Sequence, residues 1–319
     1  MTNEEERHTG AGGVATRRWR VASAPVSFGV FELTADQRPL VSPDQLLDLV
    51  VGAGYEGIDL GPVGYLGDAA SLKSRLEARG LGLAGGWMPL ALSDGALFEQ
   101  QLALLDGVLD LFEAASGPDD AFRPKPTLAD AGSPESWDHL GNRARSHTLA
   151  PSAWAELVTR IKMVAGQVRR RGFEPTFHHH LGTYVETPDE IERFLGDTDV
   201  GLCLDTGHLL AAGGDPVELF GRWGERINHL HIKDCHRAVV EQVVARDGPV
   251  RDIWSDRAFC ALGTGDLDVE GFFEAVRSSS YQGWLVVEQD RIPLPTDRPE
   301  TIASEQMANL ECLRRHGLS

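Results

Sequence analysis

The chain has 319 residues, a formal net charge of −18 at pH 7 and a pI near 5.0. This acidic surface argues against nucleic acid as a partner, because nucleic-acid affinity depends on a basic footprint. No apolar run reaches the roughly 18 residues that a membrane span needs, so we expect no membrane partner. The acidic N-terminus and four widely spaced cysteines predict a cytoplasmic protein without a secretion signal or disulfide framework.

Residues 1–18 are polar and glycine-rich and are predicted to form a disordered tail. Residues 19–319 then alternate short apolar runs with amphipathic stretches, which is typical of a single domain built on a parallel sheet. Eight strands are predicted, near residues 20–24, 57–60, 83–86, 127–129, 175–178, 201–205, 228–232 and 285–288. Eight strand-helix units in one catalytic domain predict a (β/α)8 TIM barrel, an α/β fold.

Helix starts are marked by capping residues that each precede a proline. Ser42, Thr187 and Asp215 are the predicted caps, because a side-chain oxygen before proline satisfies free backbone N–H groups at a helix start.

Two segments, near residues 116–152 and 235–267, interrupt the regular alternation of strands and helices. Long loops of such a barrel lie at its active end, so both segments are predicted to be insertions that cover the substrate.

Four potential metal ligands each end a short apolar run. They are His178, Asp205, His231 and Glu288, and the first three are separated by about one strand-helix unit. Strand ends of a TIM barrel meet at its C-terminal mouth, so we expect the four side chains to converge. Two nitrogen and two oxygen donors suit Mn, Co, Fe or Zn better than Mg or Ca, which prefer oxygen alone.

Other polar and aromatic residues near these positions are candidate site residues, and for all but His180 there is a second interpretation. His208 either contacts substrate or orients a ligand, or else it faces solvent at a helix start. His180 lies two residues after a proposed ligand and shares its side of an extended strand. Lys233 either faces the mouth and holds a substrate oxygen or lies on the exposed rim. Trp87 and Tyr65 either form an apolar wall of the site or belong to the core.

Several motifs together resemble one known superfamily. The chain is similar to the xylose-isomerase-like TIM-barrel superfamily of sugar isomerases and epimerases, and within it to the inosose dehydratase family of inositol catabolism. The resemblance spans about residues 21–290 and rests on the motifs APVSFGV (24–30), GYEGIDLG (54–61), GYLG (64–67), GGWMPL (85–90), FHHHLGT (177–183), LDTGH (204–208), GDP (214–216), HLHIKD (229–234) and GTGDLD (263–268).

The resemblance implies one divalent metal, with Mn or Co expected and Zn or Fe as further candidates. The superfamily pattern of ligands is Glu, Asp, His, Glu, and Asp205, His231 and Glu288 match its last three members. His178 stands in place of the first glutamate, a variant associated with the inosose dehydratase branch. Of the two glutamates that epimerases use on opposite faces of a substrate carbon, only Glu288 remains. Epimerisation by paired carboxylates is therefore disfavoured.

The ligand charges also favour elimination. Two carboxylates with two neutral imidazoles leave a divalent cation less neutralised, and thus a stronger Lewis acid, than three carboxylates do. We therefore expect a metal-dependent hydro-lyase that removes an α-proton from a keto-cyclitol such as 2-keto-myo-inositol and then eliminates the β-hydroxyl as water. The expected catalytic residues are Glu288, His208 and Lys233, and the expected substrate-binding residues are His180, Trp87, Tyr65 and His208.

Two alternatives to the hydro-lyase remain. The same barrel and metal also serve isomerases, epimerases and eliminating lyases that act on keto-sugars or oxidised glycosides. A non-catalytic sugar-binding barrel is the alternative from a different class, and it would hold no stoichiometric metal. In each case the partner is a small polyhydroxy ketone or sugar, and analogy with related barrels suggests a homo-oligomer.

Overall fold

The computed structural model describes residues 18–117, 122–140 and 148–319. Its main sheet is parallel throughout, with the strand order β3-β2-β1-β11-β8-β7-β6-β5-β4. The nine segments are β1 Trp19–Ser23, β2 Gly57–Ile58, β3 Gly82–Leu83, β4 Gly85–Leu90, β5 Lys125–Asp130, β6 Thr176–His178, β7 Gly201–Asp205, β8 Ile227–Ile232 and β11 Gly283–Val287.

The sheet closes because β3 and β4 are parts of one predicted strand, separated only by Ala84. The Ala84 N–H donates to Ile58 O on one side (2.9 Å), and its carbonyl accepts from the Lys125 N–H on the other (3.0 Å). The nine segments therefore correspond to eight barrel strands, as predicted. The predicted tail lies outside the described residues apart from Arg18, which donates to Arg277 O (3.0 Å).

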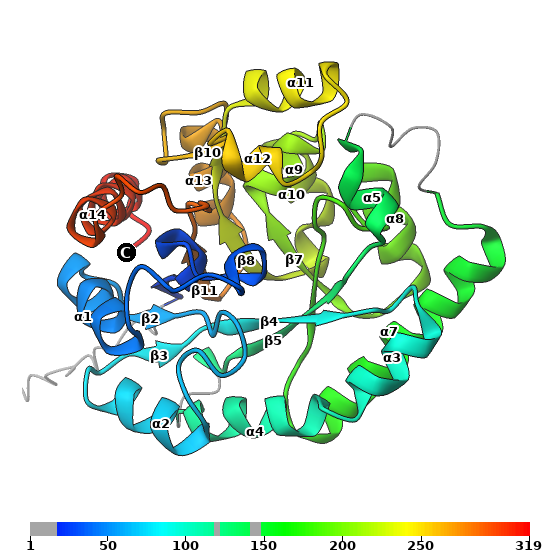
Figure 1. Cartoon of the computed structure of the whole chain (residues 1–319), viewed down its shortest axis with the longest axis horizontal. Coiled ribbons are helices and arrows are strands. Elements are labelled where there is room, and N and C mark those ends of the chain that lie inside the picture. The colour runs from blue at the N-terminus through cyan, green and yellow to red at the C-terminus, as the bar shows by residue number, and fades with distance from the viewer. Residues whose placement is uncertain (1–17, 118–121, 141–147) are drawn as a thin grey trace, which may run out of the picture.

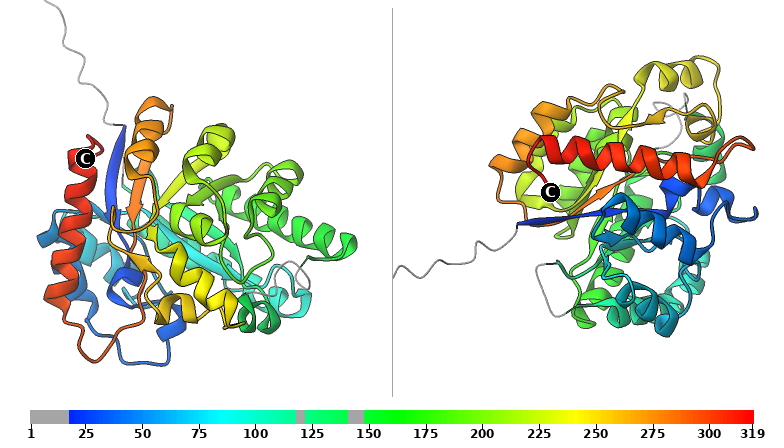
Figure 2. Two further views of the ribbon diagram at one scale, coloured as in Figure 1. Left: turned by 90° about the horizontal axis from the view of Figure 1, so that it is seen from above. Right: turned by 90° about the vertical axis from the view of Figure 1, so that its left-hand side faces the viewer.

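Helices surround the barrel, and α14 lies beside α1 (Figures 1 and 2). The three predicted caps are confirmed: Ser42 accepts from the Gln45 N–H, and Thr187 and Asp215 accept from backbone N–H groups three residues on. The helices are α1 Pro43–Ala53, α2 Ala69–Glu77, α3 Gly95–Leu102, α4 Leu105–Ala115, α7 Pro151–Arg170, α8 Pro188–Asp197, α9 Thr206–Ala211, α10 Pro216–Trp223, α13 Val269–Ser278 and α14 Pro299–Arg315, with short 3-10 turns at Pro25–Phe28, Glu32–Thr34 and Gly224–Arg226. Among the described residues, no helix is long and apolar enough to cross a membrane.

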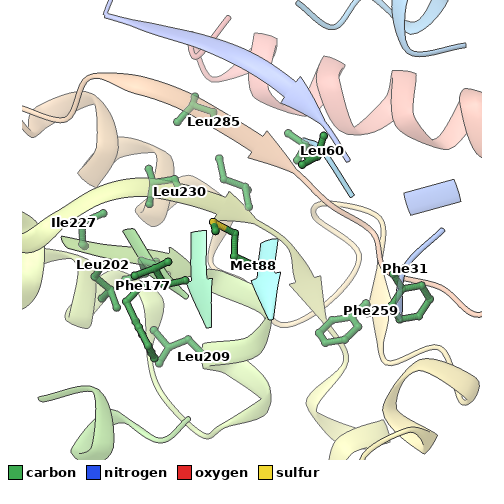
Figure 3. Close-up of a cluster of buried hydrophobic side chains, with 14 of the residues drawn as sticks. Phe31, Leu60, Met88, Phe177, Leu202, Leu209, Ile227, Leu230, Phe259 and Leu285 are labelled. Atoms are coloured by element: carbon green, nitrogen blue, oxygen red, sulfur yellow. The ribbon is translucent and has the colours of Figure 1, made fainter. Parts of the chain in front are cut away.

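Strand residues alternate between the helical layer and the barrel interior. The large apolar core contains outward-facing strand residues such as Leu202, Leu230 and Leu285 (Figure 3). The strand residues next to these point the opposite way, into the barrel interior. At the end of the interior where the strands begin, Trp284 fills the space together with small side chains. Gly57 and Gly82 make room for this indole, since a Cβ at either position would lie within 2.7 Å of it. The carboxyl end of the interior is left for polar residues.

The two predicted insertions have different positions in the fold. The first part of segment 116–152 precedes β5 and lies at the amino end, where Phe122 O accepts from Trp284 Nε1 (2.9 Å). Its later part contains α5 (Pro134–Asp138) and follows β5. Segment 235–267 follows β8 and contains two helices, α11 (Arg237–Ala245) and α12 (Asp252–Ser255). These helices lie between two short strands that pair antiparallel, β9 (Asp234–Cys235) and β10 (Phe259–Cys260). The two insertions join through hydrogen bonds from the N–H groups of Val250 to Trp137 O (2.8 Å) and of Leu140 to Gly248 O (3.1 Å).

Candidate metal centre and active site

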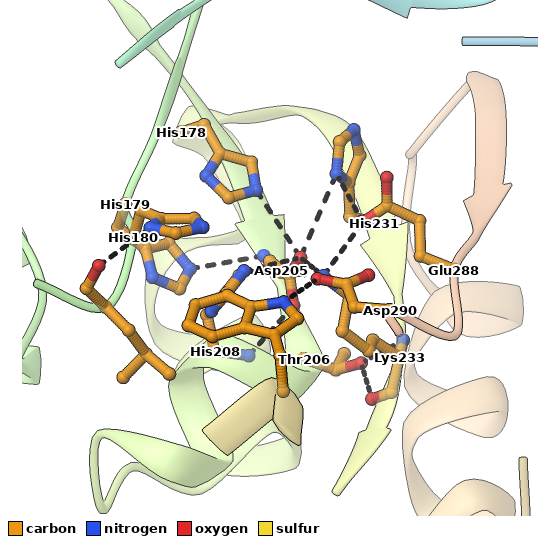
Figure 4. Close-up of polar contacts among 12 residues, drawn as sticks. His178, His179, His180, Asp205, Thr206, His208, His231, Lys233, Glu288 and Asp290 are labelled. Atoms are coloured by element: carbon orange, nitrogen blue, oxygen red, sulfur yellow. Dashed lines mark hydrogen bonds and ion pairs between the residues drawn. The ribbon is translucent and has the colours of Figure 1, made fainter. Parts of the chain in front are cut away.

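The four predicted ligands come together at the carboxyl ends of their strands (Figure 4). His178 ends β6, Asp205 ends β7, His231 lies near the end of β8 and Glu288 directly follows β11. Asp205 Oδ2 lies 3.4 Å from His178 Nε2 and 3.8 Å from His231 Nδ1, and His231 Nδ1 lies 3.2 Å from Glu288 Oε2. Donor atoms of Asp205, His231 and Glu288 all lie within 4.8 Å of one another.

These donor atoms suit a divalent cation. Among the described residues, Asp205 Oδ2 and His231 Nδ1 are buried and have no hydrogen-bond partner of good geometry. Buried polar atoms without partners are costly, and a cation bound between them would satisfy several at once. The carboxylate and imidazole donors match the preferences of Mn, Co, Fe and Zn. The residues present therefore fit the metal that the sequence predicts.

The protonation states favour cation binding at two carboxylates. Burial opposes ionisation of Glu288, but His231 and Lys233 outweigh it and lower the pKa of that carboxyl to about 2. Burial likewise opposes ionisation of Asp205, but the Lys233 ammonium outweighs it and holds the pKa of that carboxyl well below its usual range. Burial lowers the pKa of His178, whereas Cys203 and Glu288 overcome burial and raise the pKa of His231. A cation must therefore displace a proton from His231.

Lys233 is fully buried beside the proposed ligands, with 1% of its surface exposed, so it is not a rim lysine. Its ammonium lies 2.8 Å from Asp290 Oδ2, 2.9 Å from Glu288 Oε2 and 3.2 Å from Asp205 Oδ2. Burial alone would lower the pKa of Lys233, but these three carboxylates raise it well above its usual value. Lys233 is therefore a cationic hydrogen-bond donor at neutral pH.

Two neutral histidines lie on the same side of the site. Burial lowers the pKa of both His180 and His208 well below the usual range. His180 Nδ1 lies 2.7 Å from Leu181 O, so Nδ1 carries the proton and Nε2 carries the lone pair. His208 Nε2 lies 3.3 Å from the Lys233 ammonium and accepts from it, which leaves Nδ1 as the protonated nitrogen. The two rings thus offer one acceptor and one donor to a polyhydroxylated molecule.

A cavity of about 250 Å³ opens beside these groups. Trp87 lines it, and the indole Nε1 of Trp87 is buried without a partner among the described residues. Tyr65 is not among the lining residues, because its hydroxyl instead donates to Val41 O (3.0 Å) and its ring packs against the core. Tyr65 therefore has the second of its two expected positions, packed against the core and outside the residues that line this cavity. The outer wall is aromatic and aliphatic, with Val30, Phe31, Leu33, Pro62, Trp137 and Trp254.

Sequence reasoning gave no role to Asp59, His229, Trp137 and Trp254, which surround the site, whereas it expected Asp290 to supply a hydrogen bond behind the ligands. Asp59 and His229 lie next to His231, and Asp290 contacts Lys233. The sequence did carry a signal for His229 and Asp290. Each lies two positions from a proposed ligand, and residues two apart in an extended strand share one side of it. Asp59 ends the apolar run of the second strand, which is the same signal that identified the ligands. Trp137 and Trp254 had no comparable signal, because they reach the cavity from the insertions.

Residues 47–315 match the model of the family described as "xylose isomerase-like TIM barrel". The chain belongs to this family. Curated relatives include the inosose dehydratase of Geobacillus kaustophilus (28% identical, covering 94% of this chain and 96% of the relative) and that of Lacticaseibacillus casei (28%, 79% and 84%). The rhizopine catabolism protein MocC of Rhizobium meliloti is 32% identical and covers 78% of this chain and 75% of the relative.

Solved structures with the same fold are more distant in sequence. The IOLI protein, solved with a bound zinc atom, has a TM-score of 0.68 at 13% identity and covers 93% of this chain and 99% of its own. The probable 3-DHS dehydratase AsbF from Bacillus anthracis has a TM-score of 0.63 at 16% identity and covers 90% and 97%. At these identities the likeness establishes the barrel fold alone.

Proposed function

We propose that the protein is a metal-dependent hydro-lyase that dehydrates a keto-cyclitol such as 2-keto-myo-inositol. The observation that carries the proposal is the convergence of His178, Asp205, His231 and Glu288 beside the buried ammonium of Lys233. The curated relatives named inosose dehydratase, which match nearly the full barrel, support the same reaction. The protein is an enzyme, and its substrate is a small molecule.

A cation bound by these four residues would supply Lewis acidity toward a ketone oxygen and so acidify the neighbouring C–H bond. Mn or Co is the metal that we propose, and the mixed nitrogen and oxygen donors also accept Zn or Fe. His178 matters most in this set, since a neutral imidazole adds no negative charge. The proposed metal therefore keeps more of its electrophilic character than it would beside a third carboxylate.

The protein side chains supply the proton transfers of the elimination. Glu288 is ionised and is the proposed acceptor of the α-proton, while Lys233 is the proposed donor to the departing β-hydroxyl. The α C–H and β C–O bonds break, a C=C bond forms, and water leaves. The resulting enol then tautomerises to a dione. His180 Nε2 and His208 Nδ1 are placed by their tautomers to accept from and donate to other ring hydroxyls.

The charge of the cavity favours a neutral substrate. Its lining residues include one basic side chain, Lys233, and five acidic ones, Glu32, Asp59, Asp130, Glu288 and Asp290. A phosphate or carboxylate on the substrate would meet repulsion from these acids, and the described lining residues include no arginine and no second lysine to offset it. A neutral polyhydroxy ketone meets no such penalty. The binding role that we propose for Trp87 is supported by its place in the cavity wall and by its indole N–H, which has no partner among the described residues.

Isomerisation or epimerisation of a keto-sugar is the second candidate, because solved epimerases share this fold. The ligand set disfavours it, since Glu288 is its single glutamate and a two-base inversion needs a carboxylate on each face of the carbon.

All four cysteines are free and buried, which suits a reducing compartment, and we propose that the protein is cytoplasmic.

The test is a substrate panel with the metal-loaded protein. 2-Keto-myo-inositol, a keto-glycoside and a keto-sugar phosphate are incubated separately, and mass spectrometry reads loss of water against isomerisation at constant mass. We expect loss of water from the cyclitol, no turnover of the phosphate, and no activity in Asp205→Asn, which removes a ligand charge. Isomerisation without loss of water would reject the hydro-lyase.

A further inference from the structure

One carboxylate oxygen connects the second insertion to the buried lysine. Asp290 Oδ2 accepts hydrogen bonds from Lys233 Nζ (2.8 Å) and from Trp254 Nε1 (3.1 Å). All three side chains are at most 4% exposed. Asp290 Oδ1 is buried and has no partner among the described residues. The orientation of this carboxylate in the described structure therefore depends on these two donors.

In the part of the chain that the structure describes, Asp290 is the one carboxylate within 4 Å of the Lys233 ammonium that does not belong to the proposed metal set. Asp205 and Glu288, the other two carboxylates within 4 Å of the ammonium in the described structure, are both proposed ligands. A carboxylate oxygen shared with a cation is a weaker acceptor for an ammonium, because part of its charge is neutralised. Once metal is bound, Asp290 becomes the main anchor of Lys233.

Trp254 itself is held by the joined insertions. It lies in α12, and its ring stacks on Trp137 of the first insertion at 6.1 Å and on His180 at 5.7 Å. Backbone hydrogen bonds between the two insertions, described above, fix Trp137 and α12 relative to each other. The indole N–H of Trp254 thus reaches Asp290 from a segment outside the barrel strands that is held by these ring contacts and hydrogen bonds.

We propose that Trp254 is a positioning residue for the reaction: its N–H fixes Asp290, and Asp290 in turn fixes the ammonium of Lys233 beside the reacting carbon atoms. The proposal rests on the proposed function, because it takes Lys233 as the proton donor. It assigns the second insertion a part in the chemistry in addition to covering the substrate. Small displacements of a catalytic group are costly, because proton transfer requires hydrogen-bond reach.

The decisive variant is Trp254→Phe, which keeps an aromatic ring and removes the N–H. We expect kcat with 2-keto-myo-inositol to fall roughly 10- to 100-fold, the usual loss for an outer hydrogen-bond partner of a site, with KM changed less than about two-fold. The matched control is Trp154→Phe. Trp154 is also a buried indole that donates to an aspartate, Asp197 Oδ2 (2.7 Å), but it lies in α7 and does not line the cavity. The control should retain wild-type kcat.

A double-mutant cycle tests whether Trp254 acts through Asp290. Asp290→Asn is combined with Trp254→Phe, and the second change should then cost less than about two-fold in kcat, because the bond it removes has already lost its function. If the two losses in kcat multiply, Trp254 acts independently of Asp290. That outcome would overturn the proposal.

A second readout does not depend on turnover. The metal-loaded native protein is treated with limiting acetic anhydride, and peptide mass mapping compares acetylation of Lys233 with that of Lys73, Lys125 and Lys162. We expect Trp254→Phe to raise the relative acetylation of Lys233 several-fold and Trp154→Phe to leave it unchanged. Unchanged acetylation in Trp254→Phe contradicts the positioning role. Absence of turnover in wild type, with acetylation raised as expected, rejects the proposed reaction but keeps the positioning role.

Discussion

His231 Nε2 lies 4.0 Å from Asp59 Oδ2, whereas Nδ1 of the same ring faces Glu288. Both atoms of this pair, and His229 Nε2 beside them, are buried without hydrogen-bond partners among the described residues. A Cβ at Gly85 would lie 3.1 Å from His229 Nε2 and 3.3 Å from Asp59 Oδ2, so the glycine keeps this pocket open. One water molecule would satisfy all three atoms.

Asp59→Asn is predicted to weaken metal binding about 10- to 100-fold, because a carboxylate that attracts the Nε2 proton of His231 leaves Nδ1 free for the cation. Isothermal titration with Mn²⁺ measures the change. Asp36→Asn, on an exposed turn, is the control and should bind Mn²⁺ like wild type. Equal affinities in Asp59→Asn and wild type would show that Asp59 does not orient the imidazole.

His178→Glu is predicted to retain the metal and to slow dehydration at least about ten-fold. The added carboxylate neutralises one more unit of cation charge and so weakens polarisation of the ketone. His178→Gln serves as the uncharged comparison. Metal content and kcat are measured for both variants, and a rate in His178→Glu equal to that of wild type would remove the argument from ligand charge.

Chelation is predicted to abolish activity and to lower the melting temperature. A ligand that binds only the folded state stabilises it by about 2.7 kcal/mol at a concentration 100 times its dissociation constant. The melting temperature should therefore rise with Mn²⁺ concentration in wild type. In Asp205→Asn, which lacks a ligand charge, the rise should be much smaller. Full activity of a metal-free sample would contradict the metal-dependent reaction.

The pH dependence of stability is predicted to include a contribution from Asp130. Burial raises the pKa of Asp130 from 3.8 to about 6, although hydrogen bonds from Ser93 and Gly132 oppose it. The folded protein thus binds this proton more tightly than the unfolded chain. The stabilisation is present below pH 4 and is lost, by up to roughly 3 kcal/mol, as pH rises toward and above 6.

Urea denaturation of wild type and Asp130→Asn at several pH values between 4 and 7 isolates this contribution. As pH rises from 4 to 7, the unfolding free energy of wild type should fall relative to that of Asp130→Asn, because asparagine does not titrate. Parallel stability curves across this range would show that Asp130 has an ordinary pKa in the folded protein.

The barrel strands and the proposed ligands were predictable because the strands are short apolar runs in the sequence and each proposed ligand ends one of these runs. His178, Asp205 and Glu288 end or directly follow buried strands, and parallel strands of a closed barrel deliver such residues to one mouth. The helix caps at Ser42, Thr187 and Asp215 follow equally local rules. The family match then agrees with the motifs that surround these residues.

Other features depend on contacts between distant segments. Tyr65 is an aromatic residue with a hydroxyl and lies near the predicted mouth in sequence, as a site residue would. Its hydroxyl nevertheless donates a hydrogen bond to Val41 O in another loop. Trp254 reaches Asp290 from the second insertion, which backbone hydrogen bonds join to the first. No local pattern encodes either contact. By itself, therefore, the sequence determined which side chains the strands carry to the mouth of the barrel, because strand geometry is periodic. Only the tertiary structure decided how the insertions and loops complete the cavity around these side chains.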